Sequence, residues 1–140
     1  MRRDRRSLTD CYWAAFALVL CSSAAMAADN WVKLSPLADN AGTLYLDKDS
    51  IERNKDGTVR ATSRDAYDTP RKLADGAAYQ YDSRTSVYDC KNERILPISA
   101  LIQDSQHATI LSKNIDDPRW EPVQPRTEGE AVLRAVCLLQ

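Results

Sequence analysis

Residues 77–90 read "AAYQYDSRTSVYDC", and this stretch decides which type of fold the sequence predicts. It is rich in Tyr, Thr and Val, which favour β-strands, and it contains neither Gly nor Pro. The pair Asn92-Glu93 predicts a turn, after which residues 94–103, "RILPISALIQ", predict a returning strand. Pro97 lies inside that second run. Because proline cannot donate a hydrogen bond to a β-ladder, we expect an edge position or a bulge there.

The strands before and after this pair are shorter and less regular. Residues 31–34, 43–47, 50–53, 58–64 and 108–113 are the remaining strand candidates. Residues 54–57, "NKDG", predict a tight turn between two of them, because glycine accepts a positive φ angle. Residues 67–76 contain Pro70 and Gly76, and we expect a longer connection there.

The C-terminal residues 127–140, "TEGEAVLRAVCLLQ", predict the single helix. Thr127 and Glu130 have the spacing of a capping box, which marks the start of a helix. The apolar residues recur at steps of three and four and form a stripe made of Val132, Leu133, Val136 and Leu139. Such a stripe must be buried, and the sheet offers the surface. The predicted fold is therefore α+β: an antiparallel β-sheet of about six strands with a C-terminal helix packed on one face.

Residues 1–27 have the three parts of a secretory signal peptide. Arginines at positions 2, 3, 5 and 6 precede the apolar block 12–21, and Ala25-Met26-Ala27 follows as a cleavage site. We expect cleavage after Ala27, leaving residues 28–140 as a single domain without a transmembrane segment. The predicted location is the periplasm or the outer cell surface. Lipid anchoring at Cys21 is a less favoured alternative, because the bulky Leu20 precedes that cysteine.

Removal of the signal peptide would leave Cys90 and Cys137 as the remaining cysteines. Disulfides form and persist in exported proteins, and a bridge between these residues would tie the helix to the strand that ends at Cys90. In the chain-entropy model, closing a loop of this length contributes roughly 4 kcal/mol. Two free cysteines and a reactive or metal-binding thiol are the alternatives. The last needs a basic or ligating partner, and His107 is the only histidine.

The sequence carries no recognisable catalytic, cofactor-binding or metal-binding motif. Glycine-rich phosphate loops, a serine nucleophile elbow and zinc-protease motifs are missing. The formal net charge is −1, and no run of basic residues follows the signal peptide, which disfavours nucleic acid as a partner. We therefore expect a protein that is not an enzyme and has no cofactor. Tyr79 and Tyr81, two residues apart on one strand, are candidate partner-binding residues.

Several short stretches, in order, resemble the surface-adhesin protein E family of Gram-negative bacteria. They are Trp31, "LYLDKDSI" (44–51), "YDSRTSVYDC" (81–90), Arg94, "WEPVQP" (120–125) and Cys137. The resemblance implies a six-stranded antiparallel sheet and a C-terminal helix, with Cys90 and Cys137 as the bridging positions. It also implies binding of host matrix or serum proteins, such as vitronectin and laminin, and formation of a homodimer.

Three hypotheses for function follow from these observations. The first is an exported, non-enzymatic envelope protein that binds a host matrix or serum protein, similar to protein E. The second is a periplasmic housekeeping or stress-related protein with the same fold and no host ligand. The third, disfavoured by the missing catalytic motifs, is a hydrolytic enzyme that uses scattered carboxylates. Fold and function are separable, so the resemblance supports the fold more directly than it supports adhesion.

Overall fold

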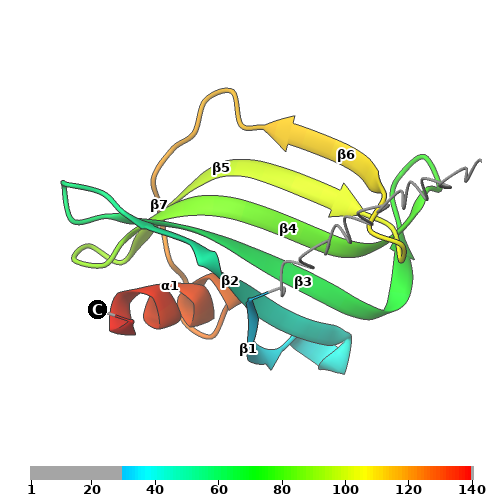
Figure 1. Cartoon of the computed structure of the whole chain (residues 1–140), viewed down its shortest axis with the longest axis horizontal. Helices are drawn as coiled ribbons and strands as arrows, with labels where there is room; N and C mark the ends of the chain where they lie inside the picture. The colour runs from blue at the N-terminus through cyan, green and yellow to red at the C-terminus, as the bar shows by residue number, and fades with distance from the viewer. Residues whose placement is uncertain (1–29, 140) are drawn as a thin grey trace, which may run out of the picture.

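The fold is an antiparallel meander closed by one helix (Figure 1). The computed structural model describes residues 30–139, so the predicted signal peptide, with Cys11 and Cys21, lies outside the described residues. The strands are β1 (Trp31–Pro36), β2 (Gly42–Arg53), β3 (Val59–Lys72), β4 (Ala78–Asp89), β5 (Arg94–Gln103), β6 (Thr109–Asn114) and β7 (Glu121–Pro122). A short 3₁₀ helix, η1 (Ala38–Asn40), follows β1, and the helix α1 (Glu128–Leu138) ends the described chain.

The seven strands form a single sheet in which chain order is also spatial order. Strands β1 to β6 lie side by side in sequence, and every neighbouring pair is antiparallel. The two-residue β7 pairs with the start of β5, beside β6. The α+β fold class expected from the sequence is confirmed, with β7 as an addition to the six long strands.

Tight turns join the strands from β2 to β6. At the predicted turn 54–57, the Asn54 amide donates to the Thr58 carbonyl at 2.9 Å, and Gly57 has a φ angle of 86°. The predicted long connection at 67–76 is wrong, because β3 continues to Lys72 and a tight turn with Gly76 at φ 90° follows. Pro70 is tolerated because the pairing of β3 with β4 is irregular between Ala66 and Arg71, where no ladder bond is lost.

Pro97 lies at a bulge, as its position in the sequence predicts. Ser86 lies opposite Pro97 and Thr85 lies opposite Ser99, so Ile98 is the extra residue of β5. On the other side of β5, Pro97 lies between the segment paired with β7 and the segment paired with β6. The missing amide hydrogen of Pro97 therefore leaves no ladder position unsatisfied.

The helix starts at the predicted cap. The Thr127 hydroxyl oxygen accepts a hydrogen bond from the Glu130 amide at 3.3 Å. The Glu130 carboxylate, however, accepts from the amide of Arg126, one residue before the position expected in a capping box. Of the predicted stripe, Val132, Leu133 and Val136 are buried. Leu139 lies just past the end of the helix at Leu138 and is 51% exposed, and its carbonyl accepts a hydrogen bond from the Arg53 side chain on β2 at 2.8 Å.

The core lies between α1 and one face of the sheet. Its fully buried side chains are Tyr88, Leu44, Leu46, Val59, Val132 and Val136. The helix contacts β1, β2 and β3, and Figure 1 shows it beneath this side of the sheet, away from β6.

The predicted disulfide joins Cys90, just after β4, to Cys137 in the last turn of α1, with a Cα–Cα distance of 5.8 Å. The second face of the sheet, which we call the open face, has no helix over it in residues 30–139.

Polar contacts hold the β4–β5 turn next to the disulfide. The Asp89 carboxylate accepts hydrogen bonds from the side chains of Arg94 and Asn92, both at 2.7 Å. These bonds lower the pKa of Asp89 to about 2. The guanidinium of Arg94 also lies 5.1 Å from the ring centroid of Trp120. The chain around Cys90 is thus positioned by side-chain contacts as well as by the bridge.

Candidate binding surfaces

His107, considered above as the partner of a reactive or metal-binding thiol, lies in the exposed turn between β5 and β6. Its backbone has a φ angle of 63°, and its ring stacks on Tyr81 with a centroid distance of 4.4 Å. Within residues 30–139, no group of three or more His, Cys, Asp or Glu side chains is placed to hold a metal ion. The contact that the structure gives the His107 ring is the stack on Tyr81.

The open face carries a group of aromatic and cationic side chains, which we call the aromatic cluster. It consists of Trp31 on β1, Tyr45 on β2, Arg64 on β3, Tyr81 on β4 and His107. Tyr45 lies directly opposite Arg64, and directly opposed residues point to the same face of a sheet. Leu44 and Leu46, on either side of Tyr45, are buried under the helix, so Tyr45 points the other way.

Arg64 is the centre of the aromatic cluster. Its guanidinium carbon lies 4.0 Å from the ring centroid of Trp31 and 5.4 Å from that of Tyr81. Its Nε donates a hydrogen bond to the Ser83 hydroxyl at 3.0 Å. Cation–π contacts of this kind order long side chains on a surface. A shallow hollow of about 320 Å³ lies among these residues. Half-buried aromatic side chains held in fixed positions are typical anchors of protein interfaces.

Tyr79, the second tyrosine predicted as a partner-binding residue, is not part of this cluster. It contacts Tyr67 edge to face, with a centroid distance of 5.8 Å. Arg71 covers the ring of Tyr67 at 4.2 Å. Tyr79 and Tyr81 are both half-buried but have different partners. Their role in partner binding remains a prediction, and the contacts favour Tyr81.

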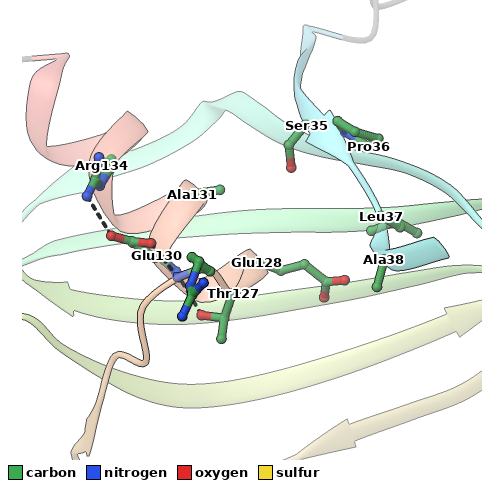
Figure 2. Close-up of a pocket in the computed structure, with 10 residues that line it drawn as sticks. Ser35, Pro36, Leu37, Ala38, Thr127, Glu128, Glu130, Ala131 and Arg134 are labelled. Carbon is green, nitrogen blue, oxygen red and sulfur yellow. Dashed lines mark hydrogen bonds and ion pairs between the residues drawn. The ribbon is translucent and has the colours of Figure 1, made fainter. Parts of the chain in front are cut away.

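A groove of about 740 Å³ separates the first strand from the helix, and we call it the β1–α1 groove (Figure 2). One wall consists of Ser35, Pro36, Leu37 and Ala38. The other wall consists of Arg126, Thr127, Glu128, Glu130, Ala131 and Arg134. Figure 2 shows the Glu128 side chain extending from α1 toward the wall that carries Leu37 and Ala38. The Glu130 carboxylate is bound to Arg134 at 2.6 Å, so the groove has charges of both signs.

A small polar cavity of about 90 Å³ lies between the sheet and the first turn of α1. Asp65 on β3, Asp82 on β4 and Glu128 on α1 contribute carboxyl groups to its lining. Asp82 forms an ion pair with Arg84 at 2.7 Å. Asp65 is only 7% exposed, and burial raises its pKa to about 7, with repulsion from Glu128 as the next cause. Its carboxyl group therefore changes charge near neutral pH.

The sequence pattern indicates Tyr81 as a candidate but not the residues that surround it in the aromatic cluster. Trp31, Tyr45 and Arg64 are spread over three strands, and only the register of those strands brings them together. The alternation of Tyr45 between Leu44 and Leu46 could have placed that tyrosine on the open face. The β1–α1 groove joins the two ends of the described chain, and no local pattern in the sequence predicts it.

Comparison with protein families gives a match over nearly the whole described chain. The family model described as "Surface-adhesin protein E" matches residues 31–138. No curated protein is significantly similar to the chain.

Solved structures of Haemophilus influenzae protein E have a similar fold. One is 12% identical over 80% of this chain and 86% of that chain, with a TM-score of 0.58. A second crystal form is 15% identical over 77% of this chain and 97% of the other, with a TM-score of 0.55. Protein E from a non-typeable strain is 15% identical over 79% and 86%, with a TM-score of 0.54. At these identities the likeness concerns the fold.

Proposed function

Because the chain belongs to the surface-adhesin protein E family, we propose that it is an exported, non-enzymatic binding protein of the cell envelope. In this proposal residues 1–27 are a signal peptide, and residues 28–140 form one protein E-like domain at the cell surface. The ligand is a host matrix or serum protein. The family match is the observation that carries the proposal. In residues 30–139, no helix has the length and apolar character needed to span a membrane.

We further propose that the aromatic cluster is the contact surface for that protein. Trp, Tyr and Arg are the residue types that contribute most to binding energy at protein interfaces. Here Trp31, Arg64 and Tyr81 are already held in position by one another, which reduces the entropy lost on binding. The cluster also lies on the open face, where the helix does not compete for space.

A binding assay tests the proposal directly. Purified residues 28–140 are immobilised, and vitronectin and laminin are passed over them in biolayer interferometry. We expect saturable binding to at least one of the two, weakened by about tenfold or more in Trp31→Ala and Tyr81→Ala. Leu111→Ala is the matched control, because Leu111 is 45% exposed on β6 and lies outside the cluster. Thermal unfolding of each variant confirms that it is folded.

Each negative result has a distinct meaning. If neither host protein binds in a saturable way, the proposed ligand class is wrong. If binding persists unchanged in both cluster variants, the contact surface lies elsewhere. Proteolysis of intact cells separates the surface location from the periplasmic alternative, because a periplasmic protein is protected until the outer membrane is opened.

A further inference from the structure

The two ends of α1 are held against the sheet by different kinds of contact. The C-terminal end is tied by the Cys90–Cys137 disulfide, and the middle of the helix buries Val132, Leu133 and Val136. The first turn instead lies over the polar cavity. Its cap bond, from the Glu130 amide to the Thr127 hydroxyl oxygen, is long at 3.3 Å. The Arg126 amide also donates to the Glu130 carboxylate at 2.6 Å, so the contacts of the first turn are mainly polar. This turn has no covalent tie like the one at the C-terminal end, and a charge beneath it can therefore affect its position.

Asp65 is a buried carboxyl group that lines the cavity beneath this turn. Its carboxyl group interacts electrostatically with neighbours but has no hydrogen-bond partner among residues 30–139. Six titratable groups interact with it or line the same cavity. They are Glu128 from α1, Asp82, Arg84 and Tyr88 from β4, and Tyr67 and Arg71 from its own strand. From β2, the opposed residue is the apolar Leu44.

Two effects of the helix on an ionised Asp65 oppose each other. The positive end of the helix macrodipole attracts a carboxylate at the N-terminus, an effect of about 0.3–1 kcal/mol. Glu128 already occupies that position, however, and burial removes water from Asp65. The pKa of Asp65 is raised to about 7, first by burial and then by repulsion from Glu128, so the seated position disfavours the charged form. An ionised Asp65 therefore favours any movement that separates it from Glu128 or admits water.

The same turn forms a wall of the β1–α1 groove. Thr127, Glu128, Glu130 and Ala131 line the groove, and Glu128 also lines the cavity that contains Asp65. Figure 2 shows these residues on the wall that faces Ser35 and Leu37. Movement of the first turn away from the sheet would thus change the shape of the groove.

We propose that the ionisation state of Asp65 controls the seating of the first turn of α1 and thereby the width of the β1–α1 groove. With Asp65 neutral, the turn lies on the sheet and the groove has the shape described above. With Asp65 charged, repulsion from Glu128 and hydration of the carboxylate loosen the turn, while the disulfide keeps the rest of the helix in place. This pH response is independent of the proposed adhesin function.

Amide hydrogen exchange, corrected for the intrinsic rate at each pH, tests this inference. The probe is the Ala131 amide, which donates to the Thr127 carbonyl at 3.2 Å, and the internal reference is the amide of the buried Val136. In the wild-type protein we expect protection of Ala131 to be about tenfold lower at pH 8.5 than at pH 5.5, with Val136 unchanged. Asp65→Asn should remove the pH dependence, and Glu128→Gln should reduce it.

Three results would overturn the proposal. The first is equal protection of Ala131 at both pH values in the wild-type protein. The second is the same pH-dependent loss in Asp65→Asn. The third is an Asp65 carboxyl group that titrates in its ordinary range when followed by carbon NMR. In Glu128→Gln, the pKa of Asp65 should fall, because one repelling charge is gone. Asp117→Asn, at an exposed ion pair, is the control and should behave as the wild-type protein does.

Discussion

Asp65 and Asp82 lie directly opposite each other on β3 and β4, beneath the first turn of the helix. Like charges in directly opposed positions destabilise a sheet. Asp82 is compensated by its ion pair with Arg84, whereas the Asp65 carboxyl group lacks such a pair among residues 30–139. The stability of the domain should therefore depend on the charge of Asp65.

We predict that Asp65→Asn stabilises the domain above neutral pH. In the folded protein the pKa of Asp65 is raised from 3.8 to about 7, so the folded state binds more protons than the unfolded state between these values. The contribution of Asp65 to the free energy of unfolding is thus highest below pH 4. It falls as the pH rises to 7 and stays low above that pH. We expect the free energy of unfolding of the variant to exceed that of the wild-type protein by about 2 kcal/mol at pH 8.

Urea unfolding of both proteins at pH 4 and pH 8 measures this difference. Asp65→Asn should raise the free energy of unfolding at pH 8 and have almost no effect at pH 4. At pH 4 the wild-type carboxyl group is also neutral in the folded state. A difference of the same size at both pH values would show that the amide acts through packing and not through charge.

The helix should contribute to stability mainly through its buried side. We predict that Val136→Ala lowers the free energy of unfolding by about 2 kcal/mol, because it leaves a cavity at a side chain that is 0% exposed. Leu138→Ala, two residues later on the same helix and 80% exposed, should change it by less than about 0.5 kcal/mol. Chemical denaturation with circular dichroism measures both, and equal effects would contradict the described packing.

Two glycines should respond in opposite directions to the same substitution. A Cβ atom added at Gly42 would clash with the backbone oxygen of Ala66 on β3, so Gly42→Ala forces the strands apart. We expect this substitution to lower the free energy of unfolding by about 2 kcal/mol or more. At Gly129, in the first turn of α1, the nearest atom would be 3.6 Å away, and alanine has the higher helix propensity. Gly129→Ala should therefore raise the free energy of unfolding by about 0.5–1 kcal/mol. Thermal unfolding distinguishes the two signs.

Loss of the disulfide should lower stability without removing the sheet. The bridge spans a sequence separation of 47 residues, for which the chain-entropy model predicts a contribution of roughly 4 kcal/mol. The double variant Cys90→Ala/Cys137→Ala should show this loss in urea unfolding. The oxidised wild-type protein should show it to a similar extent on addition of reductant. An unchanged unfolding midpoint in both cases would mean that the bridge does not constrain the chain.

The fold was more accessible from the sequence than the binding surfaces were. Strong β-propensity in residues 78–89, the Thr127 cap and the two remaining cysteines are local signals, and each predicts its element correctly. The connection predicted around Pro70 was wrong because a proline pattern cannot show that the pairing is irregular there. Arg64 contacts Trp31 and Tyr81 only because the register of strands β1 to β4 places the three residues together. That register depends on packing across the sheet.

The meander gives the disulfide a place in the order of maturation. Each of strands β2 to β6 pairs with the strand before it in the chain, so the sheet can form progressively from local pairings. Cys90 follows the fourth strand, whereas its partner Cys137 lies in the last turn of α1, after all seven strands. The bridge can close only once the helix lies on the sheet. Its formation therefore reports the last docking step of folding, and a free Cys90 thiol marks a domain whose helix has not yet docked.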